Sequence, residues 1–131
     1  APMASGATIL DMGCGAGTDL LLAARRVGSG GRAIGVDMTP AMLSVAATGA
    51  AACGLHHVDT RLGDATDLPV DAGVVDIVTS NGVLNLVPDK PRALREMWRV
   101  LRPGGRVHLA DITIGVALSE AAMRDIDLWT G

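Results

Sequence analysis

An apolar run that leads into three alternate glycines constrains this chain more than any other feature. Residues 9–19 read ILDMGCGAGTD, with Asp11 just before Gly13, Gly15 and Gly17. Glycine at such a junction permits a sharp turn and lets a ligand come against the backbone. A helix that begins after the turn presents unpaired N–H groups and the positive end of its dipole, which favour an anion. The stretch therefore predicts a strand, a ligand-binding loop and a helix, with a tight strand-to-helix turn as the alternative to ligand binding.

The rest of the chain alternates short apolar runs with segments of helical periodicity. We expect strands at residues 8–12, 32–38, 58–65, 74–84 and 106–115, and helices at 18–28, 39–55, 89–105 and 118–129. Strands with little polar alternation, separated by helices, are typical of a parallel sheet covered on both faces. Right-handed crossovers then give an α/β, doubly wound, Rossmann-like sheet, and we expect residues 1–131 to form one domain.

Composition narrows the classes of function. Hydrophobic residues make up 49% of the 131 residues, which is enough for a core. The chain has no Phe or Tyr for base stacking, and its net charge is -3 without a basic patch, so we expect no nucleic-acid partner. No apolar run reaches the length of a membrane span, and APMASGA does not read as a secretory signal. Two cysteines make neither a disulfide framework nor a zinc site, so we expect a cytoplasmic protein that binds no metal or membrane.

The spacing of the glycines separates two classes of cofactor. The dinucleotide fingerprint G-x-G-x-x-G, counted from Gly13, would put its third glycine where Thr18 stands. The D-x-G-x-G-x-G form that begins at Asp11 instead resembles the first motif of the class I methyltransferases. In that family the loop cradles the methionine part of S-adenosylmethionine, whose ammonium favours acids nearby. The resemblance therefore implies S-adenosylmethionine as the cofactor.

Further candidate residues follow the second and third expected strands, where doubly wound sheets bind ligands. Asp37 ends the second strand, and its carboxylate can accept hydrogen bonds from ribose hydroxyls. Met38 can cover one face of an adenine. The resemblance implies that Asp64 takes the adenine amino group and that the backbone N–H of Ala65 reaches a ring nitrogen. The alternatives are a solvated strand-end acid for Asp37, core packing for Met38 and a turn or helix cap for Asp64.

The loop after the fourth expected strand, SNGVLNL, should face the methyl group. We expect Asn81 to contact the cofactor or the acceptor, with turn formation as the alternative. No catalytic base stands out, and none is required when an acceptor lone pair attacks the sulfonium methyl directly. Orientation alone can contribute roughly 7–11 kcal/mol to such a step.

Longer stretches are similar to the arsenite methyltransferases and their close relatives. They are GTDLLLAARRVGSGGRAIGVDMTPAML, SNGVLNLVPDKPRALREMWRVLRPGG and LADI. That family binds trivalent arsenic through several thiolates, one of which belongs where Gly82 stands here, and Cys14 and Cys53 match none of them. We therefore expect a small-molecule methyltransferase that lacks the arsenic-binding cysteines in this chain. The alternatives are a non-catalytic S-adenosylmethionine-binding module and an NAD-dependent oxidoreductase.

The resemblance also implies further structure, because class I methyltransferases usually finish with two more strands and a cap over the acceptor. We expect this chain to be a fragment of a longer protein that lacks the last strands. Its fifth strand would then be an open edge, which invites pairing with another chain. We accordingly expect a homodimer through this edge, or additional residues that cover it.

Overall fold

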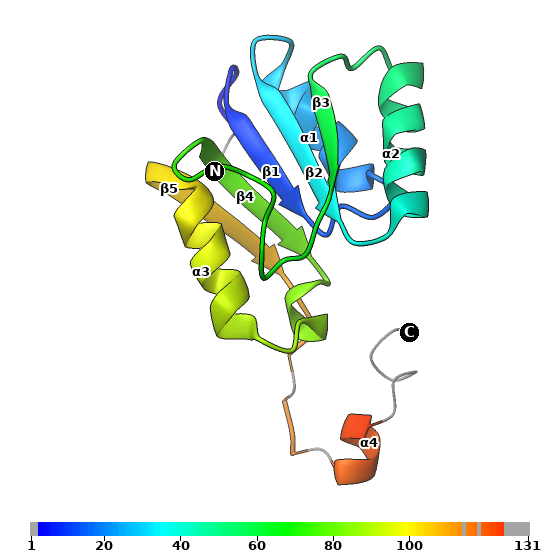
Figure 1. Ribbon diagram of the computed structural model, residues 1–131, viewed down its shortest axis with the longest axis vertical. Coiled ribbons are helices and arrows are strands. Elements are labelled where there is room, and N and C mark those ends of the chain that lie inside the picture. Colours follow the sequence, from blue (N-terminus) through cyan, green and yellow to red (C-terminus); the bar gives the residue numbers. More distant parts are fainter. Residues whose placement is uncertain (1–2, 114, 118, 125–131) are drawn as a thin grey trace.

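Five parallel strands form one sheet in the order β3-β2-β1-β4-β5, and strand order reverses between β1 and β4 (Figure 1). The computed structural model describes residues 3–113, 115–117 and 119–124. The strands are β1 Thr8–Met12, β2 Arg32–Asp37, β3 Val58–Leu62, β4 Val75–Asn81 and β5 Leu101–Ala110. The predicted α/β doubly wound sheet is confirmed.

Helices cover both faces of the sheet. The covering helices are α1 Thr18–Val27, α2 Pro40–Ala52 and α3 Lys90–Val100. A 3-10 turn η1 spans Leu84–Leu86, and the short helix α4 Glu120–Arg124 lies away from the sheet (Figure 1). Helices α1 and α2 lie on one face and α3 on the other (Figure 1). Ile9 and Leu20 belong to the core under α1 and α2, whereas Leu10 and Met97 belong to the core under α3. Alternate residues of β1 therefore enter different cores.

The junction between α3 and β5 corrects the sequence prediction. The helix expected over 89–105 ends at Val100, and residues 101–105 belong to β5. Leu101 pairs with Val75 of β4, so strand pairing takes over before Pro103 is reached. The pairing register then shifts between Val75 and Ile77, which accommodates the Pro-Gly-Gly stretch as an irregularity of the strand. The helix therefore ends where strand pairing begins, three residues before the local stop signal at Pro103.

Other expected boundaries also change. The strands expected to reach residues 65, 84 and 115 end at Leu62, Asn81 and Ala110. Helix α4 covers part of the helix expected over 118–129, and the rest of that range lies outside the described residues. Strand β5 forms one edge of the sheet. In the part of the chain that the structure describes, no helix has the length and apolarity needed to cross a bilayer.

Candidate functional site

The glycine loop joins β1 to α1 at the carboxyl edge of the sheet. Backbone φ angles of +73°, +51° and +95° occur at Gly13, Gly15 and Gly17. The amides of Gly13 and Cys14 both donate to the carbonyl oxygen of Val36, at 2.7 and 3.0 Å. The amide of Gly15 donates to Oδ2 of Asp37 at 2.9 Å. These bonds tie the loop to the end of β2 and fix its shape before any ligand arrives.

Gly17 has two roles at the start of α1. A Cβ on this residue would lie 2.8 Å from the Cβ of Ala46, so glycine is needed for the close approach of α1 to α2. Gly17 is also the N-cap of α1 and provides no side-chain cap. The N–H of Leu20 in the first turn bonds to the Asp11 carboxylate, and the N–H groups of Thr18 and Asp19 receive no cap from the Gly17 side.

A cavity of about 310 Å³ opens beside this loop at the carboxyl ends of the strands. Five of the predicted cofactor-binding residues line it, namely Gly13, Asp37, Met38, Asp64 and Ala65. The structure thus brings together residues from the first three strand ends, which are far apart in the sequence.

The opposite wall of the cavity was not predicted from the sequence. It is apolar and comes from the connection between β4 and α3, through Val83, Leu86 and Val87. Leu86 is 51% exposed, although a leucine is normally buried. The signal that could have found this wall is the apolar run VLNLVP, which lies in a loop already expected to face the ligand.

Asp37 has both carboxylate oxygens engaged with backbone amides. Oδ2 accepts the bond from Gly15, and Oδ1 accepts one from the amide of Thr39 at 2.9 Å. A carboxylate offers about four acceptor positions, so two bonds leave capacity for ribose hydroxyls. Asp37 therefore shapes the loop and still presents acceptors to the cavity.

Asp64 forms a turn and also faces the cavity. Its Oδ1 accepts bonds from the amide and the hydroxyl of Thr66, both at 2.7 Å. These bonds lower the pKa of the Asp64 carboxyl, so the group is ionised at neutral pH. Within the described residues Oδ2 has no partner, which leaves it for a hydrogen-bond donor of a ligand. The turn alternative and the ligand role are thus compatible.

Met38 is 72% exposed at the rim of the cavity, so core packing does not explain its position. Its apolar side chain and the wall formed by Val83 and Leu86 line the same cavity. A flat aromatic ring such as adenine fits between apolar groups of this kind, with Asp64 at its polar edge.

Asp11 lies beneath the glycine loop and is only 3% exposed. Burial, reinforced by the nearby charges of Asp19 and Asp37, raises the pKa of this carboxyl to about 6. The hydroxyl of Thr79 donates to its Oδ1 at 2.8 Å, which limits the rise. At neutral pH the site therefore holds negative charge under the loop, which favours a cation.

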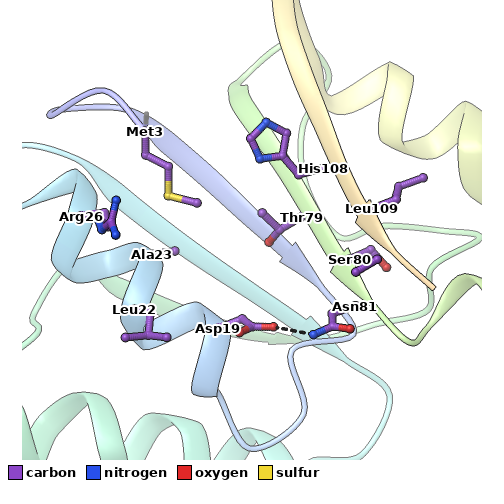
Figure 2. Close-up of a pocket in the computed structure, with 11 residues that line it drawn as sticks. Met3, Asp19, Leu22, Ala23, Arg26, Thr79, Ser80, Asn81, His108 and Leu109 are labelled. Atoms are coloured by element: carbon purple, nitrogen blue, oxygen red, sulfur yellow. Dashed lines mark hydrogen bonds between the residues drawn. The ribbon is translucent and has the colours of Figure 1, made fainter. Parts of the chain in front are cut away.

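Four predicted residues do not line the 310 Å³ cavity, namely Asp11, Gly15, Gly17 and Asn81, and of these Asn81 lines a different one. Asn81 stands at the end of β4, where its Nδ2 donates to Oδ2 of Asp19 at 3.1 Å (Figure 2). Both residues line a second cavity of about 400 Å³, together with Arg26 of α1 and His108 of β5. Figure 2 shows Asp19 and Asn81 near the glycine loop and His108 farther back along the strands. Asp19 was not predicted from the sequence.

The cysteines do not form a thiolate site. Cys14 is buried, and this burial, together with Asp11 and Asp37, raises the pKa of its thiol to about 12. Cys53 is exposed at the end of α2. Among the described residues there is no group of three or more His, Cys, Asp or Glu that could hold a metal ion.

The fold and the cavity define a class of protein that binds a nucleoside cofactor at the switch point of a doubly wound sheet. The family model of the methyltransferase domain matches residues 3–129. The chain belongs to the methyltransferase domain family. The resemblance to the S-adenosylmethionine-dependent methyltransferases, close to the arsenite methyltransferases, is thereby confirmed, as is the cofactor expected for this family.

Individual relatives agree with this family. The chain is 46% identical over 131 residues to the arsenite methyltransferase of Halobacterium salinarum, covering 100% of the chain and 34% of that protein. It is 41% identical over 118 residues to nocamycin O-methyltransferase of Saccharothrix syringae, covering 90% of the chain and 42% of that protein. The crystal structure of CrArsM, an arsenic(III) S-adenosylmethionine methyltransferase from Chlamydomonas reinhardtii, gives a TM-score of 0.85 at 36% identity. That match covers 97% of the chain and 46% of CrArsM, so the chain spans less than half the length of these relatives.

Proposed function

We propose that this protein binds S-adenosylmethionine and transfers its methyl group to a small-molecule acceptor. The observation that carries the proposal is the joint lining of one cavity by Gly13 of the glycine loop, Asp37 and Asp64. The adenine would lie between Met38 and the apolar wall, with its amino group on Asp64 and a ring nitrogen on the amide of Ala65. The ribose hydroxyls would then reach Asp37.

Charge favours this cofactor over a dinucleotide. Asp11, Asp19 and Asp37 lie close enough to one another that the last two raise the pKa of the first. A pyrophosphate placed at the glycine loop would be repelled by this cluster, whereas a sulfonium and an ammonium would be attracted. The methionine carboxylate can still use the N–H groups of Thr18 and Asp19 at the start of α1, while that of Leu20 is held by Asp11.

The reaction is a displacement at carbon. The acceptor lone pair forms a bond to the methyl carbon, the C–S bond breaks, and its electron pair stays on sulfur to give S-adenosylhomocysteine. The proton lost by a protic acceptor passes to solvent. The protein supplies position, which contributes about 7–11 kcal/mol in well-oriented systems.

Calorimetric titration with S-adenosylhomocysteine and with NAD tests the cofactor. We expect the intact protein to bind the first and not the second. Asp64→Asn should weaken S-adenosylhomocysteine binding by about 10-fold, because a hydrogen bond to a charged group is worth about 1.5–3 kcal/mol. Asp67→Asn is a matched control, since Asp67 lies in the same loop but does not line the cavity. Equal losses in the two variants would contradict the role of Asp64.

For the acceptor, we propose a hydrogen-bonding small molecule rather than arsenite held by a thiolate at position 82. Gly82 has a φ of +66°, a conformation that a cysteine adopts only at an energetic cost. The backbone amide of Asn85 donates to Oδ2 of Asp111 at 3.0 Å. The side-chain nitrogen of Asn85, in the amide orientation that satisfies its contacts, donates to Oδ1 of Asp111 at 2.8 Å. Asn85 and Asp111 thus hold each other, whereas Asn81 and Asp19 line the second cavity and offer an amide and a carboxylate that suit an amine or a hydroxyl.

A methyl-transfer assay with labelled S-adenosylmethionine checks this choice. Amines, hydroxyl compounds, thiols and arsenite would be offered to the intact protein. We expect labelled product from an amine or hydroxyl compound and little from arsenite. Arsenite as the best acceptor would contradict the proposed acceptor class, and no product from any acceptor would favour a non-catalytic binding module.

We also propose, from the edge position of β5, that a second copy or further residues pair with this strand. Pairing of two copies would appear as twice the chain mass in size-exclusion chromatography with mass detection.

We place the protein in the cytoplasm, because its two cysteines are free thiols.

A further inference from the structure

Helix α3 contacts both walls of the proposed adenosine cavity although its own residues do not line it. One wall is the segment that follows β3 and carries Asp64 and Ala65. The other is the apolar segment between β4 and α3 that carries Leu86 and Val87. Four charged side chains of the helix make the contacts, and we call them the α3 brace: Lys90, Arg92, Glu96 and Arg99.

Three members of the brace bind the first wall. Glu96 accepts a bond from the amide of Leu68 at 2.8 Å through Oε2. Arg99 donates to the carbonyl oxygens of Leu68 and Val70, at 3.0 and 2.8 Å. It also forms a fork with Glu96, with both N–H···O distances at 2.7 Å. This pair therefore fixes both polar groups of the Leu68 backbone.

Arg92 extends this contact towards Asp64. Its Nε donates to the carbonyl oxygen of Thr66 at 2.9 Å. Thr66 is the residue whose amide and hydroxyl hold Oδ1 of Asp64. The brace thus reaches the adenine-binding carboxylate through one intervening residue.

Lys90 binds the second wall at the other end of the helix. Its Nζ donates to the carbonyl oxygen of Val87 at 2.9 Å and to that of Asn85 at 3.4 Å. A helix is a rigid element, so contacts at both of its ends fix the separation of the two segments that they hold.

We propose that the α3 brace sets the width of the adenosine cavity and thereby positions Asp64 for the adenine amino group. The inference rests on the proposed function, because it concerns the same cofactor site. It assigns Arg92, Glu96 and Arg99 as positioning residues, which act on the base through the loop and do not touch the cofactor.

The test compares two ligands that differ only at the base, S-adenosylhomocysteine and S-inosylhomocysteine. The second carries a carbonyl oxygen where adenine carries its amino group, so a well-placed Asp64 should reject it by about 10-fold or more. We expect Arg99→Met to weaken S-adenosylhomocysteine binding about 10-fold and to bring the ratio of the two affinities close to one. Arg99→Lys keeps the charge but lacks the fork. Its affinity for S-adenosylhomocysteine and its ratio of affinities should lie between those of Arg99→Met and the wild type.

Arg95→Met is the matched control on the same helix. Arg95 is exposed, and the described residues offer its side chain no hydrogen bond or ion pair. This variant should keep both affinities. Amide hydrogen exchange gives an independent readout, because loss of the fork should speed exchange at Leu68. If Arg99→Met does not fold, Arg92→Lys provides the comparison with a smaller expected change, because it keeps the positive charge that lowers the pKa of Asp64 but lacks the Nε bond to Thr66.

The outcomes separate the brace from the proposed function. If the wild type does not bind S-adenosylhomocysteine, the cofactor assignment fails and the brace fails with it. If the wild type binds and discriminates but the Arg99 variant, or the Arg92 variant in its place, keeps the same ratio, the brace alone is overturned. A general loss of stability would lower both affinities equally and leave the ratio unchanged. A ratio that falls in these variants and stays constant in Arg95→Met supports the proposal.

Discussion

Replacement of Gly13 by alanine is expected to destabilise the fold and to remove most of the cofactor binding. The residue has a φ of +73°, and a Cβ at this position would collide with the side chain of Val83. We expect a loss of about 1–3 kcal/mol in the free energy of unfolding, from backbone strain and overpacking. Because Val83 belongs to the apolar wall, its displacement should also weaken S-adenosylhomocysteine binding by about 100-fold.

Gly73→Ala separates the two causes. Gly73 has a similar φ of +68°, but a Cβ there meets nothing within 4 Å, and the residue does not line the cavity. Gly73→Ala should lower the free energy of unfolding through backbone strain and leave the affinity for S-adenosylhomocysteine unchanged. Urea denaturation measures the free energy of unfolding, and calorimetry measures the affinity for S-adenosylhomocysteine. Unchanged affinity in Gly13→Ala would show that the contact between the loop and Val83 does not shape the site.

Asp11→Asn is expected to stabilise the ligand-free protein at pH 8 and to weaken cofactor binding at the same pH. The pKa of Asp11 is raised from 3.8 to about 6 by burial, so the folded state holds this proton more tightly than the unfolded chain. Its contribution to stability is fully present below pH 3.8 and is lost as pH rises through about 6. Above that pH the buried carboxylate costs about 3 kcal/mol at most, and asparagine removes this cost. Urea denaturation of both proteins at pH 5 and pH 8 measures the difference.

The ionised carboxylate of Asp11, which lowers the stability of the ligand-free protein, should strengthen the binding of a cationic cofactor. A cationic cofactor stabilises the ionised carboxylate, so we expect wild-type affinity for S-adenosylmethionine to rise as pH increases through about 6. Asp11→Asn should bind more weakly and lose this rise. Adenosine, which has neither the sulfonium nor the ammonium, is the control ligand and should show no such rise in either protein. A wild-type affinity for S-adenosylmethionine that does not change between pH 5 and pH 8 would contradict the role of Asp11.

The sequence was sufficient for the parts of the site that depend on local pattern. The glycine loop is marked by a strand, a turn and a helix that follow one another directly. Asp37 and Asp64 could be placed because the carboxyl ends of parallel strands meet at one edge of the sheet. Asp37 and Asp64 accept hydrogen bonds from the amides of Thr39 and Thr66, each two positions later in the sequence. These bonds therefore also reflect local geometry.

The features that sequence reasoning missed depend on contacts between distant segments. The end of α3 at Val100 is decided by pairing of Leu101 with Val75, which local propensity does not report. Asn81 was expected with the other predicted cofactor-binding residues, but it lines a different cavity from Gly13, Asp37 and Asp64. The α3 brace joins Arg99 to Leu68 across 31 positions of sequence, and neither residue carries a motif of its own.

A crystal structure of the intact protein with bound S-adenosylhomocysteine would show whether Gly13, Asp37 and Asp64 hold one ligand. We expect the adenine between Met38 and the apolar wall, its amino group on Asp64, the ribose hydroxyls on Asp37 and the homocysteine over the glycine loop. A ligand bound outside this cavity, or a base that leaves Asp64 in contact with Thr66 alone, would contradict this expectation.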